Sequence, residues 1–227
     1  TLKDNHKEYE FLKELNADLA IVCAYGQIIP ENFLNLTKKG FVNIHASILP
    51  SWRGAAPIQR SIMNLDPETG ISIMKIKKEL DSGPVSNIYK IKIDQNQNAQ
   101  EISEKLSALA AEKILDNVDD ILEDKAKFID QDHSKATYAK KIDKEESRID
   151  WDEDASKIIG KINGLFPSPG ASFSFNGERY KILKAEIGNG IGQVGEIISN
   201  QLEVACNKNQ SIKILEIQRQ GKRPQKI

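Results

Sequence analysis

Two short apolar runs near the N-terminus constrain the fold of this chain more than any other feature. The first is ADLAIVCAYG at residues 17–26, and the second is FVNIH at residues 41–45. Continuous apolar runs of this length are typical of strands buried on both faces of a parallel sheet. Between them, the segment from Pro30 to Gly40 has the proline start and the glycine stop of a short helix.

The same alternation of strand and helix continues to about residue 128. Helical spacing predicts helices at 7–16, 55–64 and 102–122, and apolar patterning predicts strands at 69–76 and 85–93. An α/β layered domain with a parallel-type sheet is the fold class that this order indicates. We therefore expect one α/β domain over residues 1–128.

After residue 128 the sequence becomes polar, and after Trp151 its residue pattern changes again. Residues 129–150 lack periodicity and are predicted to form a linker. A helix at 155–166 and several short strands follow, and Asn-Gly stands between two of them as in a β-hairpin. Residues 151–227 are therefore predicted to form a small β-barrel or sandwich.

Charge and cysteine content exclude several classes of protein. The formal net charge of −1 argues against a nucleic-acid binder that uses its whole surface, although residues 144–227 hold 13 Lys/Arg against 11 Asp/Glu. Basic residues gather near the end of the chain, at Arg219, Lys222, Arg223 and Lys226. The two cysteines are far apart, which favours a reducing, cytoplasmic setting. No apolar run is long enough to cross a membrane.

One glycine motif matches a dinucleotide-binding pattern, but its surroundings argue against a dinucleotide site. Gly190, Gly192 and Gly195 fit G-x-G-x-x-G, but a dinucleotide site needs a helix after the glycines, and strand-like text follows here. The sequence also lacks a P-loop, a G-x-S-x-G elbow and the His/Cys spacing of a metal site. Ser47 lies two residues after His45, but this strand end does not provide the sharp elbow of a serine hydrolase.

Asn43, His45 and Asp81 are the candidates for chemistry. Strand alternation puts Asn43 and His45 on one side of the predicted strand, and ligands bind at the carboxyl ends of such strands. Asp81 follows the third strand in a Ser-Gly-Pro turn. Asn43 could donate to a developing oxyanion, and His45 could donate to it or move a proton. Asp81 could orient the imidazole or relay the proton released by an attacking amine.

Structural explanations of these residues stand beside the catalytic one. A lone histidine at a strand end is more often a hydrogen-bonded structural residue. An aspartate before Ser-Gly-Pro is more often a turn former. Spacing alone leaves both interpretations open.

The stretches NIHASILPSWRGAAPIQ and LDSGPV resemble the signature loops of the folate-dependent formyltransferase family. The resemblance implies a partial Rossmann-like domain that uses 10-formyltetrahydrofolate as formyl donor and no metal. By the same resemblance, Asn43, His45 and Asp81 form the active centre. The turn that lines the folate site would consist of Ser47, Ile48, Leu49 and Pro50, with Ile48 in place of the usual leucine.

Two further stretches, WRGAAPIQ and TYAKKIDKEESRIDW, resemble the branch of the family that formylates methionyl initiator tRNA. That branch implies an OB-like, tRNA-binding β-barrel at 151–227, a monomer, no membrane, and the cytoplasm of a bacterium or an organelle of bacterial descent. Two alternatives remain open at this stage. One is a formyltransferase that acts on an amino sugar nucleotide, and the other is a non-enzymatic tRNA-binding module.

The resemblance also implies that the chain is truncated. In the family, a β-strand and further βα units precede the helix at which this sequence starts, and the sequence ends at GKRPQKI, short of the usual terminus. The resemblance therefore implies a piece of a longer enzyme that lacks part of the folate pocket, and it leaves the activity of the piece itself open.

Overall fold

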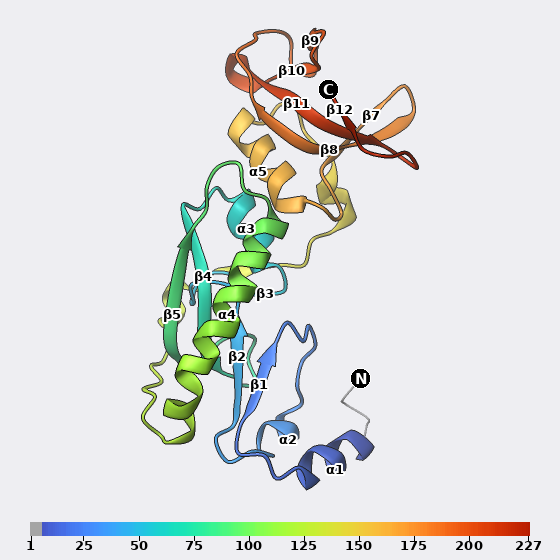
Figure 1. Ribbon diagram of the computed structural model, residues 1–227. Helices are drawn as coiled ribbons and strands as arrows, with labels where there is room; N and C mark the ends of the chain where they lie inside the picture. Colours follow the sequence, from blue (N-terminus) through green and yellow to red (C-terminus); the bar gives the residue numbers. More distant parts are fainter. Residues whose placement is uncertain (1–5) are drawn as a thin grey trace. The chain divides into compact units, whose positions relative to one another are not determined.

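The computed structural model describes residues 6–227, which divide into two compact units (Figure 1). The first unit comprises the chain up to Pro57 together with Glu68–Ile91 and Lys105–Lys140. The second comprises Ile58–Pro67, Lys92–Glu104 and Lys141–Ile227.

A four-stranded sheet forms the centre of the first unit. Its strands are β1 (Ala20–Cys23), β2 (Phe41–His45), β4 (Glu68–Lys75) and β5 (Val85–Lys92), in the order β1-β2-β4-β5. The pairing of β1 with β2 is parallel, whereas β4 runs antiparallel to β2. The sheet is thus mixed, a feature that a pattern of buried strands does not reveal.

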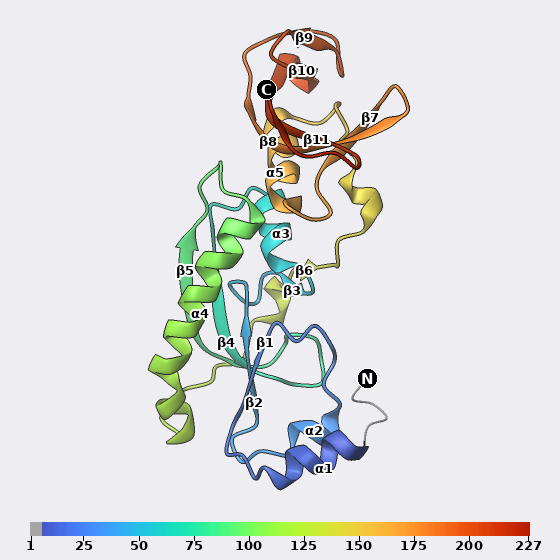
Figure 2. The same cartoon turned by 45° about the vertical axis from the view of Figure 1, so that its right-hand side comes forward.

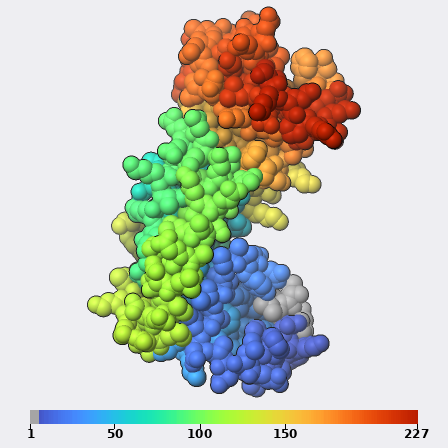
Figure 3. All heavy atoms as spheres, in the orientation of Figure 1, coloured from blue at the N-terminus to red at the C-terminus, as the bar shows by residue number. Residues whose placement is uncertain are grey.

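Helix α4 (Ala99–Leu122) covers one face of this sheet (Figures 1 and 2). Val42 of β2, Ile73 of β4 and Ile121 of α4 form a fully buried cluster, against which Tyr89 and Ile114 pack. Residues of this helix contribute to the green surface in Figure 3. The apolar stripe predicted for this helix therefore faces the strands, as amphipathic spacing requires.

Short elements complete the first part of the chain. Helices α1 (His6–Glu14) and α2 (Glu31–Leu34) accompany β1, and α3 (Pro57–Met63) follows the two-residue strand β3 (Arg53–Gly54). Strand β3 pairs in parallel with β6 (Tyr138–Ala139), which belongs to the polar segment after α4. The 3₁₀ turns η2 (His133–Lys135) and η3 (Lys144–Ser147) flank β6.

The second unit is a helix-backed antiparallel sheet. Its strands are β7 (Ser172–Phe175), β8 (Glu178–Ile187), β9 (Ile197–Ser199), β10 (Glu203–Cys206), β11 (Gln210–Arg219) and β12 (Gln225–Lys226). They pair in the order β7-β8-β11-β10-β9, with β12 beside β11. Helix α5 (Ala155–Leu165) buries Ile158, Ile162 and Leu165 against Ile182 of β8 and Ile214 of β11.

The predicted hairpin is present in this sheet. Asn176 and Gly177 link β7 to β8 and both have positive φ angles, 48° and 77°, as a two-residue type I′ turn requires. An α/β domain followed by a mainly β domain is the predicted fold class, and it is confirmed. Across residues 6–227, no helix is long and apolar enough to span a membrane.

Candidate active site

Strand β2 carries two of the three candidate residues. Its last residues alternate between the faces of the sheet, so Asn43 and His45 share a face and Ile44 points to the other. The His45 side chain is 7% exposed. The Asn43 side chain is half-buried, and within residues 6–227 its amide has no hydrogen-bond partner. A half-buried amide of this kind has its donors available to a ligand.

The structure brings Asp81 to His45. One carboxylate oxygen of Asp81, Oδ2, lies 3.7 Å from His45 Nδ1 and accepts the backbone N–H of Gly54 at 2.8 Å. At the far side of the ring, His45 Nε2 lies 2.9 Å from the carbonyl oxygen of Trp52. Because a carbonyl only accepts, Nε2 is the donor of that bond. Both ring nitrogens therefore face oxygen atoms, one of the Trp52 carbonyl and one of the Asp81 carboxylate.

Two residues of this site have left-handed backbone conformations. Trp52 has a φ angle of 60° and Asp81 one of 46°. Aspartate tolerates this region, whereas a bulky tryptophan does so only when its surroundings impose it. The backbone N–H of Trp52 donates to Thr137 Oγ1 at 2.8 Å, which holds the peptide whose carbonyl meets His45.

The turn that contains Ser47, Ile48, Leu49 and Pro50 is held from β4. Ser72 Oγ donates to the carbonyl of Ser47 at 2.7 Å and accepts the N–H of Leu49 at 3.1 Å. Ser47 is fully buried and its hydroxyl donates to the carbonyl of Ser51. Leu49 is also buried, so Ile48 and Pro50 are the two half-buried apolar side chains that this turn presents.

A buried polar network behind Asp81 has no counterpart among the sequence predictions. The Arg53 guanidinium, 3% exposed, donates from Nε and Nη2 to Gln131 Oε1 and lies 3.2 Å from His133 Nδ1. Gln131 Nε2 donates to the backbone carbonyls of Asp81 and Gly83. Gln131 lies in a polar stretch with no periodicity, so no pattern in the sequence indicates its position.

Glycine 83 fixes the loop that carries Asp81. A Cβ atom at this position would lie 1.8 Å from the carbonyl oxygen of Lys75, which is closer than any side chain tolerates. The backbone of β4 also bonds to the loop through the N–H of Lys75 and the carbonyl of Pro84. The Ser-Gly-Pro sequence therefore does form a turn, and the turn aims Asp81 at His45.

The rejected glycine motif forms part of a β–β connection. Strand β9, not a helix, follows Gly195. Glu203 Oε1 accepts the N–H groups of Asn189 and Gly190 as well as the hydroxyl of Ser211. These donors lower the pKa of Glu203, and the hydroxyl of Ser211 has the largest effect. A carboxylate thus binds the backbone N–H groups of this loop, and the predicted β–β connection is present.

A cavity of about 280 Å³ lies in the second unit, among Ile62, Leu65, Ile93 and Ile159. None of the three candidate residues lines it. In the part of the chain that the structure describes, no group of three His, Cys, Asp or Glu side chains could hold a metal ion. The functional side chains that the site itself brings together are an amide, an imidazole and a carboxylate.

Comparison with known proteins identifies two domain families in this chain. Residues 3–118 match the formyl transferase family, and residues 141–227 match the formyl transferase C-terminal domain. A methionyl-tRNA formyltransferase of Pelagibacter ubique is 66% identical over all of this chain and 73% of its own length. One of Dictyoglomus turgidum is 42% identical over 98% of this chain and 73% of its own length.

Solved structures with low sequence identity share the fold. HypX from Aquifex aeolicus, crystallised with tetrahydrofolic acid, has a TM-score of 0.74 at 19% identity and covers 99% of this chain and 40% of its own. WlaRD, a sugar 3N-formyl transferase crystallised with dTDP and 5-N-formyl-THF, has a TM-score of 0.74 at 21% identity, over 93% of this chain and 77% of its own.

Proposed function

Since this chain belongs to the methionyl-tRNA formyltransferase family, we propose that it transfers a formyl group from 10-formyltetrahydrofolate to the α-amine of methionyl initiator tRNA. The observation that supports its site is the pairing of Asp81 with His45 at 3.7 Å, on the face of β2 that also bears the unpartnered Asn43 amide. The relatives with 42% identity or more are named for methionyl-tRNA, whereas the sugar formyltransferase shares 21% identity and supports the fold alone.

We propose that Ile48 and Pro50 contact the folate, because their half-buried apolar surfaces suit a flat ring system. Ser47 and Leu49 shape the same turn from within, through the bonds to Ser51 and Ser72. When bound, 10-formyltetrahydrofolate would supply the formyl carbon: the methionine amine adds to it, the bond from that carbon to N10 then breaks, and N10 takes up a proton in place of the one that the amine loses.

Asn43 is the proposed oxyanion donor. Its Nδ2 hydrogens have no acceptor within the described residues and can bond to the formyl oxygen as that oxygen gains negative charge. In the geometry observed, His45 Nε2 already donates to Trp52, so Asn43 is the donor that meets the oxygen first. Donors that are fixed before the reaction stabilise the charge without reorganising.

Asp81 is the proposed proton acceptor, with His45 beside it. Its Oδ2 atom is occupied by Gly54 and faces His45, while no hydrogen bond engages Oδ1 within residues 6–227. Oδ1 can therefore accept the proton that the attacking amine loses. The His45 ring lies beside this carboxylate, with Nδ1 3.7 Å from Oδ2.

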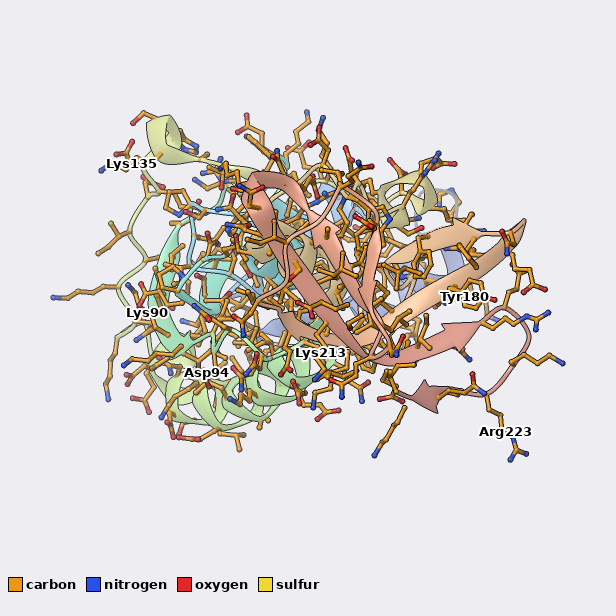
Figure 4. The ribbon with its side chains drawn as sticks, turned by 90° about the horizontal axis from the view of Figure 1, so that it is seen from above. Lys90, Asp94, Lys135, Tyr180, Lys213 and Arg223 are labelled. Carbon is orange, nitrogen blue, oxygen red and sulfur yellow. The ribbon has the colours of Figure 1, made fainter. Side chains whose placement is uncertain are left out.

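The second unit is proposed to bind the tRNA. Of the basic residues near the end of the chain, Arg219 is paired with Glu178, whereas Lys222, Arg223 and Lys226 are exposed. In Figure 4 the Arg223 side chain extends from the loop before β12 into solvent. Exposed cations of this kind bind phosphates with an affinity that falls as salt rises. We propose residues 1–128 as the catalytic domain, 129–150 as the linker and 151–227 as the tRNA-binding domain.

We propose a monomer, located in the bacterial cytoplasm or in an organelle of bacterial descent, where initiator tRNA is charged. Light scattering tests the oligomeric state. A tRNA-binding assay with Lys222→Ala and Arg223→Ala tests the basic residues: each substitution should weaken binding and reduce the slope of log K against log salt by about 0.7–0.9. Unchanged slopes would place the tRNA elsewhere.

Formyl transfer to charged initiator tRNA, followed with labelled donor, tests the catalytic assignment. Asn43→Ala and Asp81→Asn should each lower turnover by about 10²–10³-fold. Asp130→Asn serves as the matched control, because among residues 6–227 its exposed carboxylate pairs only with Lys77. Turnover within a few-fold of the parent in either site variant, with the fold intact by circular dichroism, would refute the assignment.

A further inference from the structure

Gln131 joins a buried cation to the loop that carries Asp81. On one side its Oε1 accepts two N–H groups of Arg53, at 3.1 and 2.8 Å. On the other side its Nε2 donates to the carbonyls of Asp81 and Gly83, at 2.9 and 2.7 Å. Gln131 is 8% exposed and Arg53 is 3% exposed, so the whole relay is shielded from solvent.

The guanidinium determines which way the Gln131 amide faces. Arginine has donors only, so the atom that meets Arg53 has to be the amide oxygen. The amide nitrogen then necessarily points to the opposite side, where it finds two carbonyl acceptors. Arg53 makes no ion pair with a carboxylate among residues 6–227, so this amide is a main compensation for burying its charge.

Other bonds also hold this loop, since Ser82 donates to the Glu79 carbonyl and the N–H of Lys75 donates to Pro84. Among the described residues, only Gln131 bonds to the carbonyl of Asp81 itself. The carboxylate of Asp81 has one backbone donor, Gly54, and its own backbone is in the left-handed region with φ at 46°. With His45 Nδ1 already 3.7 Å from Oδ2, a shift of 1 Å in the loop would separate the two groups. The two bonds from Gln131 hold the backbone on both sides of Ser82 and so prevent that shift.

The segment that contains Gln131 also holds the backbone that supports His45. Six residues after Gln131, Thr137 accepts the N–H of Trp52 through its hydroxyl, and its carbonyl accepts the N–H of Arg53. The carbonyl of Trp52 in turn accepts from His45. Residues 131–137 thus contact the supports of both His45 and Asp81, although they lie about 80 residues from Trp52 and Arg53.

We propose that Gln131, oriented by Arg53, is a positioning residue that holds the Asp81 carboxylate against His45. The proposal rests on the catalytic role of Asp81 proposed above. Gln131 reaches the reaction only through the backbone of the 81–83 loop, so its loss should lower kcat and leave the KM for the formyl donor nearly unchanged.

Gln131→Glu separates positioning from stability. Glutamate keeps an oxygen for Arg53 and adds opposite charge, so the fold should be preserved, but it has no N–H for the two loop carbonyls. We expect a melting temperature that is lowered by the two unpaired loop carbonyls but stays above that of Gln131→Met, because the charge pair with Arg53 offsets part of the loss. We expect kcat to fall by about 10–50-fold, since small misplacements of a catalytic group have effects of this size. Gln131→Met, which adds no charge, should lower kcat similarly and also lower the melting temperature.

Gln210→Glu is the matched control. Gln210 is a partly buried glutamine of the second unit whose Oε1 accepts the N–H of Ala155, and the substitution keeps that acceptor. It should leave kcat unchanged. All turnover numbers are normalised to the folded fraction at the assay temperature, measured by circular dichroism, so that a partly unfolded variant still reports on its folded molecules.

A double-mutant cycle with Asp81→Asn shows whether Gln131 acts through Asp81. If it does, Gln131→Glu should cost less than about twofold once Asp81 is already asparagine, because the two substitutions remove the same contribution. Parent-like kcat in Gln131→Glu or Gln131→Met, or fully additive losses in the cycle, would overturn the proposal. Failure of the catalytic role proposed for Asp81 is a separate outcome, because Asp81→Asn alone would then keep the turnover of the parent.

Discussion

Ser72 offers a direct test of how the turn at residues 47–50 is held. Its hydroxyl is fully buried on β4, where it donates to the carbonyl of Ser47 and accepts the N–H of Leu49. Ser72→Ala removes one oxygen atom and leaves the rest of the strand unchanged. Both backbone groups of the turn then lose their partner at once.

The expected cost follows from the burial of those groups. Ser47 is completely buried and Leu49 is 4% exposed, so water cannot easily replace the hydroxyl. A buried backbone group without a partner costs about 1–3 kcal/mol, which gives about 2–6 kcal/mol for the two together. A looser turn should also raise the KM for 10-formyltetrahydrofolate by about fivefold, the equivalent of ~1 kcal/mol.

Urea unfolding measures the free energy, and hydrogen exchange of the peptide that spans residues 43–54 reports the local effect. Ser86→Ala is the control in the same sheet, because the Ser86 hydroxyl makes one bond, to the carbonyl of Ile73, and should cost about 1 kcal/mol or less. If the two variants lose the same stability within 0.5 kcal/mol (a margin of about the additivity error), Ser72 does not hold the turn as described.

Three further predictions concern other contacts. Gly83→Ala should lower both the yield of folded protein and kcat, because the new methyl group would meet the carbonyl of Lys75; normal activity would show that the loop can move freely. Hydrogen bonding by Arg60 lowers the pKa of Glu146 to about 2, from an ordinary value of 4.5, so this pair should stabilise the second unit fully above about pH 4.5 and lose its effect as the pH falls towards 2. Glu146→Gln should therefore cost about 1–2 kcal/mol at pH 7, after allowance for the pair's partial exposure, and nothing near pH 2, as acid titrations of the two proteins would show. Glu203→Ala should speed hydrogen exchange in the loop at 188–192 by about tenfold or more, because two of its backbone donors lose their acceptor.

Local pattern was enough to predict most of the regular elements. The helix expected at 155–166 is α5, and the strands expected at 69–76 and 85–93 are β4 and β5, each within one or two residues. These elements bury an apolar face, so their periodicity is visible in the sequence. The direction of β4 against β2 left no such trace, because a buried strand has the same composition in either direction.

The site was predictable only in part. Strand alternation put Asn43 and His45 on one face, and the resemblance to formyltransferases implied Asp81; the structure brings Asp81 to His45. Arg53 and Gln131 could not be paired from the sequence, because a hydrogen bond between residues 78 positions apart has no local signature. Buried polar networks of this kind are fixed by tertiary structure, and their amino-acid sequence resembles that of ordinary solvated loops.

The pairing of β3 with β6 has a consequence for the time at which the site is completed during synthesis. Trp52 and its partner Thr137 are 85 residues apart, so the support for His45 is absent from the nascent chain until that partner leaves the ribosome. At about 5–20 residues per second, the wait lasts roughly 4–17 s. A ribosome-bound chain that ends at residue 130 should accordingly be cut readily by proteases between residues 47 and 54, and one extended well beyond residue 139 should resist them.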